Sequence, residues 1–329
     1  MVNNRLMTKR LDNIVVVGQG AMGLLWYHHL SQDNISSSTS ANVNINNNVT
    51  LLASKQDLLS PNELKTTRYQ FTPYQQDHAK NHALIYSAQV DITSADIILL
   101  CLKSFHIASA IKKIAKDIPP HCIVILAHNG IGTFEAVAKL LPNTQVILAM
   151  LTTHGSLRNA PLTITHTGLG QTDIGLLSGE LSNPQKEQLT SQLNLALPHV
   201  CFHQDIKKKQ WLKLAINCVI NPITAINNID NGEVNDKKFS KQVNLVLTEI
   251  IELSQAENIG LTYTDLQAMV YKVALATEKN CSSMRSDILA GRSTEVDYIN
   301  GYIHRLGKKN NIATPENTRL WQQVLNLKR

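Results

Sequence analysis

Runs of branched and aliphatic residues alternate with helical segments along the first part of the chain. The apolar runs lack a polar–apolar alternation, which is typical of strands buried on both faces of a parallel sheet. They occupy residues 14–17, 49–53, 96–103, 121–127 and 146–151. Helical segments lie between them at residues 24–30, 105–116 and 133–141. This order of strands and helices predicts a doubly wound α/β domain.

The character of the chain changes near residue 205. Residues 162–175, in which glycines stand among Thr and Ile, predict an edge hairpin. We predict a Rossmann-type doubly wound sheet in residues 1–205, followed by an all-α domain in residues 206–329. Within the first domain, residues 31–48 are rich in Ser and Asn and are expected to form a low-complexity insertion loop. Helices of the second domain are predicted at residues 209–221, 236–257, 264–279 and 294–310.

A glycine-rich sequence follows the first predicted strand and opens the first predicted helix. It reads Gly18-Gln19-Gly20-Ala21-Met22-Gly23, which is G-x-G-x-x-G in the strand–turn–helix context that the motif requires. The first glycine allows a tight turn, the second lets the backbone approach a pyrophosphate, and the third permits close helix–strand packing. The helix N-terminus would offer N–H groups to the phosphates. We predict dinucleotide binding, with a plain tight turn as the alternative.

The residues after the second predicted strand bear on the choice of nucleotide. An NAD-specific fold places Asp or Glu there to hold the ribose 2′-hydroxyl. The chain instead has Ser54 and Lys55, and its first carboxylate is Asp57. Because a hydroxyl and a cation suit a 2′-phosphate, we predict NADP rather than NAD as the cofactor.

Two polar side chains follow later strands of the predicted sheet. Lys103 ends the run at 96–103, and Asn129 comes after the run at 121–127. Ligands of doubly wound sheets bind beyond the carboxyl ends of the strands, where the glycine-rich sequence also lies. The coincidence favours a ligand site at this edge, although Asn129 with Gly130 could also form an ordinary turn.

The most informative stretch is the first predicted helix of the second domain. Lys213, Asn217 and Asn221 stand at i, i+4 and i+8, so a helix would carry an ammonium and two carboxamides on one face. Asn is a poor helix former, which favours a polar ligand over a surface helix with scattered polar residues. Pro222 is expected to end or kink the helix at Asn221, and a turn is expected at Asn231.

A second polar constellation lies nearer the C-terminus. A helix entry capped by Ser282 or Ser283 is predicted there, and Glu295 is predicted in the first turn of the next helix. A carboxylate in a first turn also complements the helix dipole, so Glu295 has a plain structural interpretation as well as a functional one.

Composition and charge narrow the class of protein. The 329 residues are 43% hydrophobic and 17% charged, as in an ordinary globular protein. The net charge of +6 is modest, no Lys/Arg block resembles a nucleic-acid-binding arm, and no apolar run reaches the length of a membrane helix. The five cysteines are widely spaced without C-x-x-C, and the histidines lack metal-ligand spacing. We therefore expect reduced thiols, a cytoplasmic protein and no metal site.

Several strings together resemble the ketopantoate reductase (2-dehydropantoate 2-reductase) family. The resemblance covers nearly the whole chain apart from the leader and residues 31–48. The family's usual Q-N-G is His128-Asn129-Gly130 here, which keeps the asparagine. Its T-T-T-H-A stretch reads Leu151-Thr152-Thr153-His154-Gly155. The strings that carry the resemblance are G-Q-G-A-M-G at 18–23, H-N-G-I-G at 128–132, K-L-A-I-N-C-V-I-N-P-I-T-A-I at 213–226, N-G-E-V at 231–234, S-S-M-R-S-D-I at 282–288, G-R-S-T-E-V-D-Y-I-N-G at 291–301 and A-T-P-E-N-T at 313–318.

The resemblance implies roles for individual residues. Lys213 would donate a proton and bind substrate, and Glu295 would orient the lysine, the cofactor ribose or both. Lys103 and Asn129 would lie near the nicotinamide ribose and the reacting carbonyl, and Ser156 would touch the cofactor. The hydroxyl and carboxylate groups of the substrate would be held by Asn217, Asn221, Asn231 and Ser283.

The implied activity is NADPH-dependent reduction of 2-dehydropantoate (ketopantoate) to (R)-pantoate, a step of pantothenate and coenzyme A synthesis. A cation near the C2 carbonyl would stabilise the growing negative charge and deliver the proton. One alternative is a reductase of another branched 2-oxo acid. Another is a catalytically silent NADPH-binding regulator, which would have little use for Lys213 with Glu295. The expected partner is a small 2-oxo acid, with no nucleic acid or membrane, and the chain is expected to be a monomer or homodimer.

Overall fold

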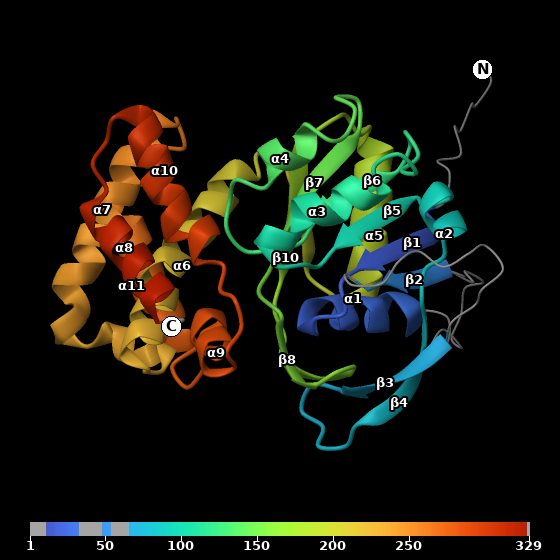
Figure 1. The fold of residues 1–329 in the computed structure, drawn as a ribbon, viewed down its shortest axis with the longest axis horizontal. Helices are drawn as coiled ribbons and strands as arrows, with labels where there is room; N and C mark the ends of the chain where they lie inside the picture. Colours follow the sequence, from blue (N-terminus) through green and yellow to red (C-terminus); the bar gives the residue numbers. More distant parts are fainter. Residues whose placement is uncertain (1–10, 33–47, 54–65, 328–329) are drawn as a thin grey trace. The chain divides into compact units, whose positions relative to one another are not determined.

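The computed structural model describes residues 11–32, 48–53 and 66–327. The chain divides into two compact units, shown in Figure 1. The first unit contains the chain up to His128 together with Ala136–Ile206. The second contains Asn129–Glu135 and the chain from Lys207 onward. The short segment 129–135, which the sequence places in the first domain, is therefore grouped with the helical unit.

A seven-stranded sheet forms the centre of the first unit, as the predicted α/β class requires (Figure 1). Its strand order is β11-β10-β7-β6-β5-β1-β2, and the five strands from β7 to β2 are parallel. Strand β10 pairs with β7 in the antiparallel direction, and β11 is parallel to β10, so these two strands run opposite to the other five. The strands are β1 (Asn13–Val17), β2 (Asn48–Leu52), β5 (Ile97–Leu100), β6 (Ile123–Leu126), β7 (Val146–Thr152), β10 (Thr172–Ser178) and β11 (Val200–His203). The helices of this unit are α1 (Ala21–Gln32), α2 (Gln89–Thr93), α3 (Ser104–Ile114), α4 (Phe134–Ala138, which begins at the unit boundary) and α5 (Asn183–Ala196).

A second sheet of four strands has no counterpart in the sequence-based prediction. Its order is β4-β3-β9-β8, and it joins segments far apart in the chain, with Phe71 opposite Ile164. The predicted hairpin at residues 162–175 is wrong, because β9 pairs with β8 across a two-residue connection and leaves β10 to pair with β7. The strands are β3 (Thr66–Thr72), β4 (Lys80–Ile85), β8 (Gly155–Ala160) and β9 (Thr163–Gly168).

Helix α1 lies between the two sheets of the first unit (Figure 1). Trp26 is fully buried, and the Tyr27 hydroxyl accepts a hydrogen bond from the Ile85 N–H of β4 at 2.9 Å. The His28 ring stacks on Phe71 of β3 with ring centroids 3.6 Å apart. Contact on both sides explains why this helix, which begins in the glycine-rich sequence, is apolar nearly all round.

The second unit is helical, as predicted, and α6 (Lys207–Asn227) packs against α7, α8, α9 and α11. The predicted helix at 294–310 is instead a short 3-10 turn followed by α10, because Ile299 interrupts it with φ −112° and ψ −98°. The other elements are η1 (Asn231–Asn235), η2 (Lys237–Phe239), α7 (Ser240–Ala256), α8 (Tyr263–Ala276), α9 (Ser283–Leu289), η3 (Val296–Tyr298), α10 (Asn300–Asn310) and α11 (Pro315–Asn326).

Helix α6 does not end at Asn221, which was one of the two outcomes expected from Pro222, the other being a kink. It continues to Asn227 with the proline inside it. Proline has no N–H, so the carbonyl of Cys218, one turn earlier, loses its helical partner. The Nδ2 of Asn300 donates a hydrogen bond to this carbonyl oxygen at 2.9 Å in a buried contact. A side chain from α10 thus replaces the missing backbone bond, and the helix persists.

Candidate functional site

The glycine-rich turn has the backbone geometry that its sequence predicts. Gly18 has φ +110°, and a Cβ atom there would lie 2.6 Å from the carbonyl oxygen of Cys101. A Cβ on Gly23 would lie 1.9 Å from the carbonyl oxygen of Gly18. Around Gly20, in contrast, a Cβ would meet no described atom within 4 Å. Two glycines are required by the protein's own packing, whereas the middle one leaves space beside the backbone.

The start of α1 suits the phosphates of a dinucleotide. Leu24 N–H donates to Gly20 O at 3.0 Å, so the helix is formed directly after the turn. The N–H groups of the preceding turn have no intrahelical acceptor, and the first turn contains no acidic side chain. The open position at Gly20 therefore adjoins N–H groups that have no intrahelical acceptor, at the positive end of a helix, which fits an anionic pyrophosphate.

Ser156 and Lys103 both lie close to this turn. The Ser156 hydroxyl on β8 donates to the carbonyl oxygen of Ala21 at 3.1 Å. Lys103 precedes α3 and follows β5, which pairs directly with β1. Cys101, two residues before the lysine, donates its N–H to Val17 O at 2.9 Å. The first unit thus brings together the glycine-rich turn, the strand that carries Ser156 and the segment that carries Lys103, which lie far apart in the sequence.

Lys213, Asn217 and Asn221 lie on α6, as the periodicity predicts. Lys213 and Asn217 are half-buried, and Asn221 is buried. The helix therefore carries its ammonium and amide groups along one stripe beside a buried apolar face. Such a stripe can bind a small polar molecule and place a proton donor next to it.

A hydrogen bond ties the C-terminal half of α6 to the start of α9. The hydroxyl groups of Thr224 and Ser282 are hydrogen-bonded to each other at 2.7 Å, and both side chains are buried. Ser282 also accepts from the Arg285 N–H at 3.1 Å and so caps α9, as predicted. Ser283, the first residue of α9, is thereby held beside the turn of α6 that follows Asn221.

Asn231 is attached to the chain segment before α9. Its backbone N–H donates to Asn280 O at 3.1 Å, and the next N–H, of Gly232, donates to Glu278 O at 3.1 Å. Its side-chain Nδ2 donates to Thr277 Oγ1 at 3.0 Å. The second unit therefore links the elements that carry Asn221, Asn231 and Ser283.

Glu295 is a buried carboxylate in a tight turn. It is 5% exposed and precedes η3, whose Tyr298 N–H donates to the Glu295 carbonyl oxygen at 2.9 Å. The Ile131 N–H donates to Tyr298 O at 3.1 Å, and a Cβ on Gly130 would lie 2.3 Å from the same oxygen. The predicted site residue Asn129 is consequently next in sequence to a segment packed on the Glu295 turn.

The cysteines near these residues are neutral thiols. Burial raises the pKa of Cys101 beneath the glycine-rich turn and of Cys218 within α6. Burial also raises the pKa of Cys281, with the Arg285 guanidinium opposing the shift. The thiolate, not the thiol, is the nucleophile, so these three side chains are poorly suited to nucleophilic catalysis.

Ser54 and Lys55, predicted to hold a 2′-phosphate, lie outside the described residues, as do residues 33–47 of the insertion. In the part of the chain that the structure describes, no cluster of three His, Cys, Asp or Glu side chains could hold a metal ion. Nor does any helix in that part have the length and apolarity to cross a membrane.

The residues that hold the predicted site residues in place were not predicted from the sequence. Thr277 contacts Asn231, Thr224 contacts the α9 cap, and Asn300 replaces the bond that Pro222 removes. A proline inside an otherwise continuous helical pattern is the one local signal that such a partner exists, because its unpaired carbonyl must be satisfied. Thr277 and Thr224 carry no comparable signal.

Both halves of the chain match sequence models of one family. The model described as ketopantoate reductase PanE/ApbA matches residues 14–179, and its C-terminal counterpart matches residues 205–328. The 2-dehydropantoate 2-reductase of Vibrio cholerae is 32% identical over 315 residues, 96% of this chain and 97% of the relative. That of Shigella flexneri is 36% identical over 233 residues, 71% of this chain and 74% of the relative.

Solved structures share the fold at lower sequence identity. The ternary structure of D-mandelate dehydrogenase with NADH and anilino(oxo)acetate has a TM-score of 0.81 at 22% identity, covering 96% of this chain and 98% of the other. The 2-dehydropantoate 2-reductase from Geobacter metallireducens has a TM-score of 0.78 at 22% identity, covering 95% and 99%. At this level of identity the likeness concerns the fold.

Proposed function

The chain belongs to the ketopantoate reductase family, and from this premise we propose that it reduces 2-dehydropantoate to (R)-pantoate with NADPH. The observation that carries the proposal is the stripe of Lys213, Asn217 and Asn221 on α6, in a chain whose first unit has a glycine turn with the geometry of a phosphate-binding loop. The reaction would serve pantothenate and coenzyme A synthesis. We also propose a cytoplasmic protein that acts as a monomer or homodimer.

Lys213 is the proposed proton donor. During reduction, negative charge builds on the C2 carbonyl oxygen of the substrate, and an ammonium within hydrogen-bond reach stabilises it and delivers the proton. Glu295 is proposed to orient the lysine, the cofactor ribose or both. Its burial supports a positioning role, because a buried carboxylate is retained only where it is paired or hydrogen-bonded. The substrate would be held by Asn217, Asn221, Asn231 and Ser283.

NADPH is the proposed cofactor, and its nicotinamide would supply the hydride. The turn from Gly18 to Gly23 would bind the pyrophosphate, and Ser156, which contacts Ala21, supports this turn from β8. Lys103 and Asn129 are proposed to lie near the nicotinamide ribose and the reacting carbonyl. The preference for NADPH over NADH rests on Ser54 and Lys55, which suit a 2′-phosphate.

The proposal is tested by following NADPH oxidation with 2-dehydropantoate as substrate. Pyruvate and other branched 2-oxo acids measured beside it address the alternative of a reductase with a different substrate. We expect kcat/KM to be highest for 2-dehydropantoate and higher with NADPH than with NADH. Faster reduction of another 2-oxo acid would reassign the substrate, and NADPH binding without turnover of any 2-oxo acid would favour the silent regulator.

A further inference from the structure

The side chain of Asn231 has one polar atom that the described residues leave without a partner. Asn231 is 8% exposed, and its backbone N–H and its Nδ2 are both used in hydrogen bonds. Its Oδ1 is buried with no hydrogen-bond partner among the described residues. A buried carbonyl oxygen without a donor is costly, so this atom calls for a donor that the described residues do not supply.

Thr277 determines which atom of the Asn231 side-chain amide has no partner among the described residues. Its hydroxyl donates its single proton to the carbonyl oxygen of Val273, one turn earlier in α8, at 2.8 Å. The hydroxyl oxygen therefore accepts from the amide, and the group facing it is the nitrogen of Asn231, 3.0 Å away. The reversed amide would set oxygen against oxygen and leave a buried NH₂ group unpaired.

The backbone around Asn231 leaves little freedom for it to move. Gly232 donates its N–H to Glu278 O at 3.1 Å, and a Cβ on this glycine would lie 2.7 Å from the Glu278 Cβ. On the other side, Asp230 forms an ion pair with Arg285 of α9. The position of Asn231 is thus set by its neighbours, and the orientation of its amide by Thr277.

We propose that Thr277 is a positioning residue: by fixing the amide of Asn231, already proposed to bind substrate, it presents Oδ1 as the acceptor for a hydroxyl group of the substrate. The inference rests on the proposed function, because it takes Asn231 to be a substrate-binding residue. A carboxylate has no proton to donate at neutral pH, so Asn231 Oδ1 cannot bind the acid group. The donor of 2-dehydropantoate is its 4-hydroxyl group. Asn231 therefore selects 2-oxo acids that carry this hydroxyl.

Two substrates test the role of the hydroxyl directly. The first is 2-dehydropantoate, and the second is 3,3-dimethyl-2-oxobutanoate, which has a methyl group in place of the hydroxymethyl group. The parent protein is expected to prefer the first by about 10- to 100-fold in kcat/KM, because the second leaves Asn231 Oδ1 unpaired. The ratio of the two kcat/KM values is the measured quantity, and any unfolded fraction of a preparation cancels in it.

Thr277→Val and Thr277→Ser form a matched pair of variants. Valine keeps the shape of threonine but removes the acceptor that orients the amide, whereas serine keeps the hydroxyl. In Thr277→Val we expect kcat/KM for 2-dehydropantoate to fall about tenfold, mostly through KM, while that for the dimethyl analogue changes less than about twofold. Thr277→Ser should retain the parent ratio.

The outcomes separate the inference from the function on which it rests. A parent that reduces 2-dehydropantoate, with a substrate ratio that Thr277→Val leaves unchanged, would overturn the inference alone. Equal losses for both substrates in Thr277→Val would also overturn it, since they would mean that Thr277 supports the fold or that Asn231 binds a group common to both. A parent that reduces neither substrate would overturn the proposed function, and the inference with it.

Discussion

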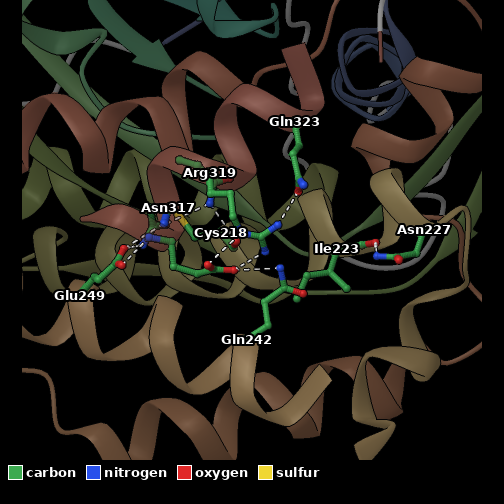
Figure 2. A network of polar contacts seen from close by, with 10 residues as sticks. Cys218, Ile223, Asn227, Gln242, Glu249, Asn317, Arg319 and Gln323 are labelled. Carbon is green, nitrogen blue, oxygen red and sulfur yellow. Dashed lines mark hydrogen bonds and ion pairs between the residues drawn. The ribbon is translucent and has the colours of Figure 1, made fainter. Parts of the chain in front are cut away.

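The carboxylate of Glu249 holds Asn317 at the start of helix α11, accepting its backbone N–H at 2.9 Å and its side-chain Nδ2 at 2.7 Å (Figure 2). The Oδ1 of Asn317 accepts a hydrogen bond from Asn300 Nδ2 at 3.0 Å, and the same nitrogen donates to the Cys218 carbonyl oxygen. The carbonyl that Pro222 leaves unpaired in α6 is thereby connected, through buried side chains, to the cap of α11. This network stabilises the helix that carries Lys213 and its two amides.

The network predicts that Asn300 and Pro222 are energetically coupled. Asn300→Ala would leave Cys218 O and Asn317 Oδ1 unpaired, at a cost of about 2–5 kcal/mol in the free energy of unfolding. In a Pro222→Ala background the restored N–H can bond Cys218 O, so the same substitution should cost about 1–2 kcal/mol less. Urea unfolding of the four proteins of this double-mutant cycle measures the coupling. Additive effects would show that Asn300 does not compensate for the proline.

Local signals in the sequence were sufficient where one short segment determines the structure. Ile14–Val17 is apolar without alternation and forms a strand buried in a parallel sheet, and the adjoining glycines adopt the turn their spacing predicts. The i, i+4, i+8 spacing from Lys213 likewise gives one helix. In these cases backbone preference and burial agree within a few residues.

The features that the sequence did not predict depend on contacts between residues that are distant in the chain. The four-stranded sheet pairs residues near 70 with residues near 164, and no local pattern specifies that pairing. The continuation of α6 beyond Pro222 also depends on such a contact, since the donor to the unpaired Cys218 carbonyl oxygen is Asn300. Thr277, which orients Asn231, is an unremarkable residue at a helix end until its contacts are known.

Histidines between α1 and the four-stranded sheet predict that the first unit is sensitive to acid. Burial lowers the pKa of His28 to about 3, with His29, His82 and His166 adding to the shift. Burial lowers the pKa of His29 to about 4, with His166 and His154 contributing. Burial also lowers the pKa values of His82, His154 and His166. The charge of Lys80 adds to the shift of His82, and His166 and His199 add to that of His154.

Whether acid raises or lowers the free energy of unfolding depends on which state, folded or unfolded, binds more protons. Well above pH 6.5 these histidines are neutral in both states, so their contribution to stability is fully present. As the pH falls toward about 4 for His29 and about 3 for His28, the unfolded chain takes up protons that the folded chain does not. Between pH 6.5 and 5 each of these two histidines should lower the free energy of unfolding by about 2 kcal/mol.

The variant that tests this is His29→Leu. The Nε2 of His29 has no hydrogen-bond partner among the described residues, so leucine removes the titration without breaking a bond at that atom. Urea unfolding at pH 7.5 and pH 5 should show a smaller acid-induced loss than in the parent, by about 2 kcal/mol. His106→Leu, at an exposed position on α3, serves as the control. An equal loss in His29→Leu and the parent would contradict the prediction.

Substitutions of two glycines in the same turn should have opposite consequences. Gly20→Ala places a methyl group where no described atom lies within 4 Å, so we expect a thermal midpoint within about 2 °C of the parent. The methyl group would obstruct the pyrophosphate and raise KM for NADPH about tenfold or more. Gly23→Ala forces a contact with Gly18 O and should instead destabilise the protein by about 1–3 kcal/mol or more. An unchanged KM in Gly20→Ala would place the cofactor elsewhere.

Lys213→Ala is predicted to remove the proton donor and the charge that stabilises the developing alkoxide. Its position on α6, on the same helix face as Asn217 and Asn221, motivates the assignment. We expect kcat with 2-dehydropantoate to fall by about 100- to 10,000-fold. Lys241→Ala, at an exposed position on α7, removes a lysine elsewhere in the helical unit and should leave kcat unchanged.

Chemical rescue distinguishes loss of the ammonium from damage to the fold. Added methylamine can occupy the space of the truncated side chain and supply both a positive charge and a proton. The rate of Lys213→Ala should therefore rise with methylammonium concentration, whereas an equal concentration of tetramethylammonium, which has no proton to donate, should not restore it. The thermal midpoint of the variant, measured alongside, establishes that the protein is folded. Near-parental turnover in a folded Lys213→Ala protein would assign the proton donor to another residue.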